Sequence, residues 1–170
     1  EEGVEAEDDA LVAIARGSEG GLRDAESALD QLVSFRGNRI NEEDVLSVFG
    51  LASRKMMEEL VDDLLEGRIG QVLKRVEELD SGGKDLQRVV LDLIAYFRDM
   101  LVCIHAGKDA ESLGIMSGQT EVLERQAAKT DSERILRLAD IITETENRMR
   151  YALSRRTLLE TALIRCSRAV

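Results

Sequence analysis

The sequence predicts an all-α protein with two parts, a small three-helix domain over residues 1–51 and a larger helical bundle over residues 52–170. Its apolar residues recur at the three- and four-residue spacing of helices with one apolar face, and no segment shows the two-residue alternation of a strand. Proline, which interrupts helices, is absent from the 170 residues. Apolar residues make up 44% of the chain and aromatic residues only 3%, so we expect a core of aliphatic side chains.

Three helices are expected in the first domain. The first covers about residues 6–16 and ends where glycines at positions 17, 20 and 21 interrupt it. The second covers about residues 22–35. The third starts at Asn41, whose side chain can accept a hydrogen bond from a free amide of the first turn, and ends at Gly50, the expected hinge between the domains. The apolar side of the second helix is expected to carry Leu22, Ala25, Leu29, Leu32 and Val33.

Five helices are expected in the second domain. The clearest runs from Leu86 to Ile104 with a continuous apolar face, and Gly107 ends it. The last begins at Thr130-Asp131-Ser132-Glu133, which matches a capping box with Thr130 as the N-cap, and continues as one long helix to the C-terminus. The other three are expected over residues 53–66, 69–79 and 120–128.

The charge of the chain is acidic and unevenly distributed. The net charge of the chain is −11. Residues 1–51 contain 13 acidic and 4 basic residues, and residues 52–170 contain 21 acidic and 19 basic residues. Neither part has the basic excess that a phosphate backbone requires, so we do not expect the chain to bind nucleic acid by itself. No stretch approaches the ~18 apolar residues of a membrane span. The N-terminus does not have the pattern of a signal peptide, so we expect no contact with a membrane. It also lacks an initiator methionine, so we expect the chain to be a piece of a longer protein.

No residue pattern in the sequence forms a catalytic or metal site. A glycine-rich phosphate loop with a lysine is missing. Cys103 and His105 are two residues apart, which puts them on different faces of a helix. We expect Cys103 and Cys166 to be buried, reduced thiols and His105 to be a partly exposed residue at a helix end. Paired acids are expected on solvated helix faces, at Glu58-Glu59, Asp62-Asp63 and Glu77-Glu78.

The segment Gly20-Gly21-Leu22-Arg23-Asp24 has features of an anion-binding helix start. A helix N-terminus carries partial positive charge, so a cation such as Arg23 in the first turn is unfavourable by about 0.3–1 kcal/mol. Glycines permit unusual backbone angles and the close approach of another group. Arg23 beside free backbone amides is therefore suited to receive a phosphate. The alternative, that Arg23 pairs with Asp24 or another acid of the chain, stays open.

Several stretches of the sequence share the pattern of one protein family. They are Asp8-Asp9-Ala10-Leu11, Ile14-Ala15-Arg16, Gly20-Gly21-Leu22-Arg23-Asp24-Ala25, Leu29-Asp30-Gln31, the positions Ile40, Val45, Val48 and Gly50-Leu51, then Gly83-Lys84-Asp85-Leu86, Leu93-Ile94-Ala95-Tyr96-Phe97-Arg98-Asp99-Met100-Leu101 and Leu158-Leu159-Glu160-Thr161-Ala162-Leu163-Ile164-Arg165. They resemble the bacterial DNA polymerase III gamma/tau family, the ATPase motor of the sliding-clamp loader in the AAA+ superfamily. The resemblance is most specific over residues 8–51 and covers essentially the whole chain.

The resemblance implies a role for each domain. Residues 1–51 would be an AAA+ lid, and residues 52–170 a collar that holds subunits in a ring. In the family, the arginine of the Gly-x-x-Arg-Asp segment is the sensor-2 residue, which reaches the phosphates of ATP bound by a preceding ATPase domain, and Arg23 is the residue that matches. The phosphate loop, the magnesium-binding acids and the trans-acting arginine lie in that preceding domain. This chain would thus have no catalytic residue, no metal site and no ATPase activity alone, with ATP and Mg²⁺ bound in the longer protein.

The resemblance also implies partners. The collar would bind other gamma/tau copies and the delta and delta-prime subunits, and the chain would meet the sliding clamp and primed DNA only through the complete complex in the cytoplasm. We also expect arginines between Ser132 and Arg168, such as Arg156 and Arg165, to meet acids such as Asp62 on a neighbouring copy and to give weak self-association. Two alternatives stay open: an acidic helical interaction scaffold without nucleotide sensing, and the related delta-prime subunit, which lacks ATPase activity.

Overall fold

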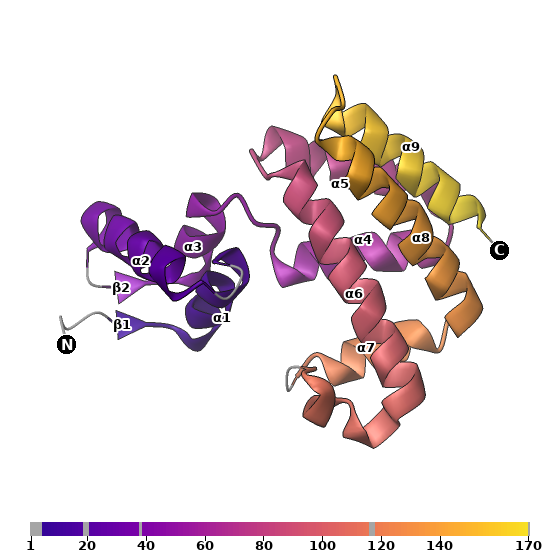
Figure 1. Cartoon of the computed structure of the whole chain (residues 1–170), viewed down its shortest axis with the longest axis horizontal. Coiled ribbons are helices and arrows are strands. Elements are labelled where there is room, and N and C mark those ends of the chain that lie inside the picture. Colours follow the sequence, from indigo (N-terminus) through magenta and orange to yellow (C-terminus); the bar gives the residue numbers. More distant parts are fainter. Residues whose placement is uncertain (1–4, 19–20, 38, 116–117, 170) are drawn as a thin grey trace. The chain divides into compact units, whose positions relative to one another are not determined.

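The computed structural model describes residues 5–18, 21–37, 39–115 and 118–169, and it confirms the predicted all-α class (Figure 1). The chain forms two compact units, Glu1–Ser53 and Arg54–Val170, where we expected a boundary after Leu51. Each unit has an apolar core of its own. None of the helices in the described ranges is both long and apolar enough to cross a membrane.

The first unit combines three helices with a short parallel pair of strands. The expected helix start near Ala6 is wrong, because Ala6 lies in a strand opposite Ile40. The Glu7 amide donates to the Ile40 carbonyl (3.2 Å), which keeps the chain extended up to Glu7. The elements are β1 (Glu5–Ala6), α1 (Asp8–Gly17), α2 (Leu22–Arg36), β2 (Arg39–Ile40) and α3 (Glu42–Val48).

The predicted cap of α3 is confirmed. Asn41 Oδ1 accepts a hydrogen bond from the Asp44 amide (2.9 Å), and Asp44 Oδ2 accepts one from the Asn41 amide (3.4 Å). This reciprocal capping box satisfies two amides that would otherwise have no partner at the helix start. It fixes the point at which the chain leaves β2 and enters α3.

Apolar residues from the three helices and from β2 form the core of the first unit. The prediction for Leu22 is wrong, since this side chain is 76% exposed. Leu22 is the first residue of α2, and the part of α2 that packs against the core begins a turn later, at Ala25. The buried members of the core are Ala10, Ala13, Ile14, Leu32, Ile40, Val45, Leu46 and Leu51.

Gly17, at the end of α1, lies against the ring of Phe49. A Cβ atom added to Gly17 would lie 2.5 to 2.7 Å from three carbons of that ring, closer than real Cβ contacts allow. The backbone of Gly17 is helical, so space rather than conformation requires a glycine here. Phe49 follows α3, and this contact therefore fixes the end of α1 against the end of α3.

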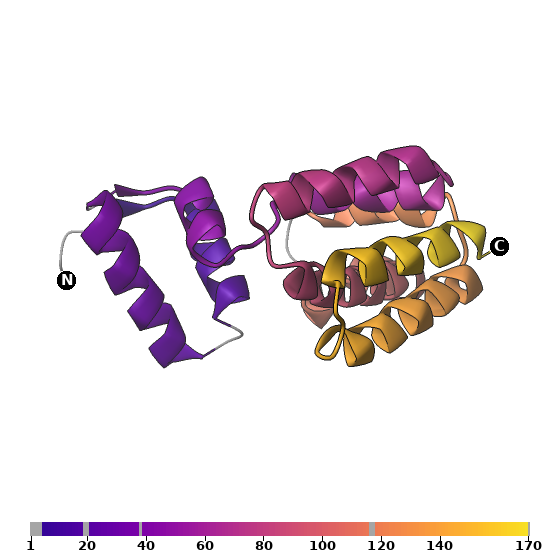
Figure 2. The ribbon, with the colours of Figure 1, turned by 90° about the horizontal axis from the view of Figure 1, so that it is seen from above.

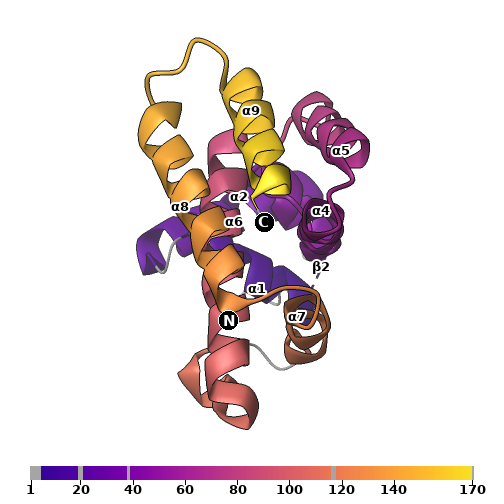
Figure 3. The same cartoon turned by 90° about the vertical axis from the view of Figure 1, so that its right-hand side faces the viewer.

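The second unit is a helical bundle built on α6. Leu93, Phe97 and Met100 of α6 are completely buried, and α6 packs against α7, α8 and α9. Figures 2 and 3 show α4 and α5 on one side of the unit and the antiparallel pair of α8 and α9 on the other. The elements are α4 (Arg54–Leu65), α5 (Ile69–Ser81), α6 (Leu86–Ala106), the 3-10 helices η1 (Gly107–Asp109) and η2 (Glu111–Leu113), α7 (Thr120–Ala127), α8 (Ser132–Met149) and α9 (Arg155–Arg168).

The predicted single helix from residue 130 to the C-terminus is wrong, because the chain turns back after Met149. Leu153 lies in this turn, and its side chain is 109% exposed. The hydroxyl of Ser154 then accepts a hydrogen bond from the Thr157 amide (3.2 Å) and starts α9. Met149 and Leu153 are four residues apart, so the helical spacing of apolar residues continues across the turn and does not reveal it.

The N-cap of α8 is Asp131 and not Thr130, so that prediction is also wrong. Asp131 Oδ1 accepts a hydrogen bond from the Arg134 amide (2.8 Å). A carboxylate at this position also interacts favourably with the positive end of the helix, which a neutral hydroxyl does not. The helix therefore begins one residue later than the capping-box pattern indicated.

Asp63 is buried, against the prediction that the paired acids are solvated; its exposed fraction is 3%. Its carboxylate accepts hydrogen bonds from Arg68 Nε (2.6 Å) and from Arg75 Nε, and Arg75 also donates to Glu59 Oε2 (2.6 Å). Burial by itself would raise the pKa of Asp63, but the hydrogen bonds and charges of Arg75 and Arg68 outweigh it and hold that pKa below its ordinary value. The cluster links α4 to α5.

A second buried polar group joins α4, α6 and α7. Gln126 is completely buried. Its amide nitrogen donates to the Glu58 carbonyl (2.9 Å), and its Oε1 accepts a hydrogen bond from the Tyr96 hydroxyl (2.5 Å). Burial raises the pKa of Tyr96 well above its ordinary value, so the phenol stays protonated and can donate this bond.

Cys103 and Cys166 are buried and free, as predicted. Burial raises the pKa of Cys166 to about 12 and also raises that of Cys103. Because the thiolate is the reactive form of cysteine, both thiols are unreactive at neutral pH.

Replacing Gly17 by alanine should destabilise the first unit. The new methyl group would overlap the ring of Phe49, and overpacking of this kind costs about 1–3 kcal/mol. Gly70 in α5 is the matched control, because nothing lies within 4 Å of a Cβ atom added there. Gly70→Ala should therefore be neutral or stabilise the chain by up to about 1 kcal/mol. Urea unfolding of both variants checks this, and a Gly17→Ala chain as stable as the wild type would contradict it.

The Asp63 carboxylate should stabilise the second unit in a pH-dependent way. Its pKa in the folded chain is lowered below the value of about 3.9 expected when unfolded. The stabilisation is therefore fully present above that pH and is lost as the pH falls through the lower, folded pKa. Asp63→Asn should reduce the free energy of unfolding at pH 7 by about 1–3 kcal/mol.

Urea unfolding between pH 7 and pH 3 would measure this difference. We expect it to begin to shrink below about pH 4, where the carboxylate of the unfolded chain takes up a proton, and to disappear as the pH falls through the lower pKa of the folded chain. Asp140 on α8 is exposed, and Asp140→Asn serves as the control. A cost of Asp63→Asn that is the same at every pH would rule out the charge of Asp63 as its origin.

Candidate functional site

The candidate site is the start of α2, and a compact turn leads the chain into it. The amide and the hydroxyl of Ser18 both donate to the Ile14 carbonyl, at 3.0 and 2.6 Å. The Gly21 amide in turn donates to the Ser18 carbonyl (2.7 Å). Gly20 lies outside the described residues. These bonds tie the first residue before α2 to the end of α1 and so fix where Arg23 stands.

The structure gives Gly21 a role different from the expected one. Its φ of −76° and ψ of 109° are angles that any residue adopts, so it does not supply an unusual backbone conformation. Lack of space favours a glycine at this position, because a Cβ atom added to Gly21 would lie 3.0 Å from Asp24 Oδ2 and 3.1 Å from the Ser18 carbonyl oxygen. The Asp24 carboxylate therefore lies close to the start of the helix, where its negative charge is favourable.

Arg23 is exposed in the first turn of α2. Its carbonyl accepts a hydrogen bond from the Ser27 hydroxyl (2.9 Å), but its side chain makes neither a hydrogen bond nor an ion pair with any residue that the structure describes. The alternative in which Arg23 pairs with Asp24 is thus not seen. A planar guanidinium and the free amides of a helix start can together bind an oxyanion.

Arg23 stands in an acidic unit. Residues 1–51 carry 13 acids and only 4 bases, and Asp24 and Glu26 are exposed near it. One guanidinium in such surroundings is insufficient to hold a multiply charged phosphate, because the neighbouring carboxylates repel it. The site is chemically incomplete by itself and needs further cations or amides from another part of a protein.

The remaining candidate residues form no site. His105 is exposed in the last turn of α6, as predicted, and its Nε2 lies 3.1 Å from the Ser132 hydroxyl. Within the described ranges, no three His, Cys, Asp or Glu side chains are grouped so that they could hold a metal ion. The thiols of Cys103 and Cys166 are buried and lie outside any such group.

Most of the surface arginines of α8 and α9 have partners within the chain. Arg165 donates to Glu144 (3.1 Å), and Asp62, which we expected to meet an arginine of another copy, pairs instead with Lys129 (2.7 Å). The side chains that we expected to meet across two copies are thus already paired within one chain, and their contact with another copy stays a prediction. The other pairs are Arg156 with Glu77, Asp80 and Glu160, Arg155 with Asp85, Arg148 with Glu144, and Arg137 with Glu133.

Two family models together match almost all of the chain. The model for DNA polymerase III subunits gamma and tau domain III matches residues 40–170. The model for the DNA polymerase III clamp loader subunit, ATPase lid domain, matches residues 1–38, which include Arg23. The two matches meet at β2, earlier in the chain than the boundary between the compact units.

Curated relatives and a solved structure agree with these matches. The chain is 29% identical over 167 residues to DNA polymerase III subunit tau of Bacillus subtilis, covering 96% of this chain and 29% of that protein. It is 28% identical over 169 residues to DNA polymerase III subunit gamma/tau of Mycobacterium tuberculosis (strain H37Rv), covering 97% and 29%. The chain thus spans less than a third of the length of these relatives. The fold is similar to that of the Bacillus subtilis DNA clamp loader delta protein, with a TM-score of 0.61 and 16% identity over 98% of this chain and 52% of that one.

Proposed function

Because the chain belongs to the DNA polymerase III gamma/tau family, with its lid and domain III, we propose that its first unit senses ATP through Arg23 and that its second unit assembles a clamp-loader ring for DNA replication. The observation that carries the sensing role is the exposed side chain of Arg23, which has no partner among the described residues. A cation placed at a positive helix end and left without an anion is a disfavoured arrangement. Binding of a nucleotide phosphate would relieve it.

Arg23 would act as one contact of a site completed by the ATPase domain of a longer protein. The turn through Ser18 and Gly21 holds the start of α2, so the guanidinium approaches the phosphate from a fixed position. Loss of the γ-phosphate removes that contact. The lid then prefers a different position, because only interactions that differ between two states can shift the balance between them.

ATP and Mg²⁺ would both be bound mainly by that ATPase domain. Arg23 fits a phosphate oxygen in charge and in donor geometry. The described residues offer no cluster of acids for a metal ion, so we assign the Mg²⁺ ligands to the longer protein. ATP hydrolysis itself is assigned there too.

The second unit would hold gamma/tau copies together with the delta and delta-prime subunits in the cytoplasm. Residues 52–170 have 21 acids and 19 bases, so long-range repulsion between copies of this unit is weak. Contact with the sliding clamp and with primed DNA would come through the complete complex. A ring of collars would convert the movement of one lid into a change of shape shared by all subunits.

In the full-length protein, Arg23→Ala should weaken ATP-dependent clamp loading. Losing a charge-assisted contact of about 1.4 kcal/mol is a tenfold effect, so we expect a decrease of about tenfold or more in the loading rate. Arg39→Ala is the control, since Arg39 is another exposed arginine of the same unit. Loading assays with the reconstituted complex measure both variants. Wild-type loading by a folded Arg23→Ala protein would refute the sensing role and favour the interaction scaffold.

The 170-residue chain alone should show no ATPase activity. One arginine, without a phosphate loop or metal ligands, does not stabilise the transition state of phosphoryl transfer. A phosphate-release assay on highly purified chain checks this. Turnover that follows the chain through purification and is unaffected by Arg23→Ala would mean that the chain holds a site of its own.

A further inference from the structure

The loop between α8 and α9, residues 150–154, exposes two large apolar side chains. Tyr151 is 83% exposed and Leu153 is 109% exposed, more than any other large apolar residue in the described part of the chain. A single exposed leucine is ordinary on a protein surface. Two such residues at the tip of one loop are typical of a contact surface. We call residues 150–154 the docking loop.

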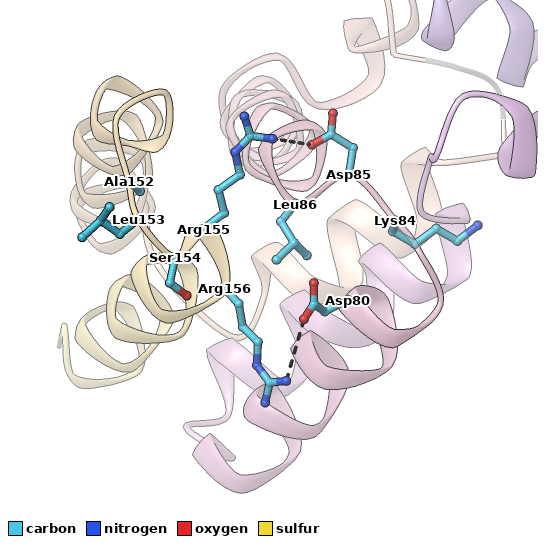
Figure 4. A pocket seen from close by; sticks show the side chains of 9 residues that line it. All are labelled: Asp80, Lys84, Asp85, Leu86, Ala152, Leu153, Ser154, Arg155 and Arg156. Carbon is cyan, nitrogen blue, oxygen red and sulfur yellow. Dashed lines mark ion pairs between the residues drawn. The ribbon is translucent and has the colours of Figure 1, made fainter.

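An open hollow of about 670 Å³ lies beside the docking loop (Figure 4). Leu153 lines it on one side, and the starts of α6 and α9 line it on the others. Arg155 pairs with Asp85 and Arg156 pairs with Asp80, each at 3.8 Å, and Lys84 also lines the hollow. The hollow is lined mainly by polar and charged side chains, so the apolar part of the surface is the docking loop itself.

The docking loop contains one arginine and no acid, in a chain whose net charge is −11. Three further arginines flank the loop, at positions 148, 155 and 156, and each of these is ion-paired within the chain. Arg150 is exposed, and its side chain makes no ion pair or hydrogen bond with a described residue. The loop thus presents two apolar side chains and one unpaired cation, which suits a partner surface that is both apolar and acidic.

The outer face of α1 has this complementary chemistry. Leu11 is 53% exposed, and Asp8 and Ala15, which share its helical face, are exposed as well. The side chain of Asp8 has no ion pair with a residue that the structure describes. We call Asp8, Leu11 and Ala15 the α1 outer face.

We propose that the docking loop of one copy binds the α1 outer face of a second copy of this chain. Tyr151 and Leu153 would cover Leu11, and Arg150 would pair with Asp8. The contact joins two different surfaces of the chain, the docking loop of the second unit in one copy and α1 of the first unit in the other. It rests on the proposed assembly function and adds to it the two surfaces that meet and the participation of the first unit.

Sedimentation of the wild-type 170-residue chain over a range of concentrations tests the apolar part of the contact. The double variant Tyr151→Ser/Leu153→Ser should lower the association constant by about tenfold or more, because a tyrosine at the centre of a contact contributes strongly to binding. Leu136→Ser is the matched control, since Leu136 is an exposed leucine (52%) of α8 in the same unit. This control should associate as the wild type does.

A charge exchange tests the pairing of Arg150 with Asp8. Chains with Arg150→Glu alone, or with Asp8→Arg alone, should each associate about tenfold more weakly than the wild type, because like charges then face each other. An equimolar mixture of the two variants should restore association, since every contact between unlike chains again joins opposite charges. Circular dichroism of each variant verifies that it is folded.

The outcomes separate this contact from the proposed function. Association of the wild type that all loop and α1 variants retain would overturn the contact and leave collar assembly standing. A mixture of the two charge variants that stays monomeric would overturn it equally. A wild-type chain that is strictly monomeric at high concentration would overturn the contact, while Arg23→Ala in the loading assay would still test nucleotide sensing separately.

Discussion

The position of Arg23 depends on the turn that joins α1 to α2. Ser18 closes the end of α1 through two bonds to the Ile14 carbonyl, and Gly21 is bonded back to Ser18. Gly17 allows the ring of Phe49 to lie against the same turn. The start of α2 is therefore held by backbone hydrogen bonds and by packing, and the Arg23 side chain is not used to stabilise it. Because the Arg23 side chain is not needed for the local fold, its guanidinium is available for a ligand.

The two units handle charge in opposite ways. In the second unit, acids and bases neutralise each other, either buried as in Asp63 with Arg75 or at the surface as in Lys129 with Asp62. The first unit has too few bases for this, with 4 against 13 acids up to Leu51. The surface of the first unit therefore keeps negative charge that no base compensates. Arg23 is an exposed cation on this acidic unit. The second unit is therefore close to electrically neutral, whereas the first unit is strongly negative.

The sequence predicted the helices of the core well and the turns less well. The spacing of apolar residues located α6, and the N-cap residue Asn41 identified the start of α3, because each of these patterns depends only on neighbouring residues in the sequence. Met149 and Leu153 kept a helical spacing across a turn, so the break before α9 was missed. The burial of Asp63 was also missed, since it depends on Arg75 in the next helix and adjacent acids resemble a solvated face. Arg23 was identified as the candidate site residue from its position at a helix start, whereas the exposure of Tyr151 depended on that unpredicted turn and gave no signal in the sequence.

The most direct test of the account is the distance between the Arg23 guanidinium and the nucleotide in the complete protein. A structure of the full-length clamp loader with a slowly hydrolysed ATP analogue would measure it. We expect an arginine nitrogen about 2.7–3.1 Å from an oxygen of the γ-phosphate in at least one subunit, a distance typical of a charge-assisted hydrogen bond. A nucleotide-bound subunit in which Arg23 points into solvent or pairs with a carboxylate of the lid would contradict it.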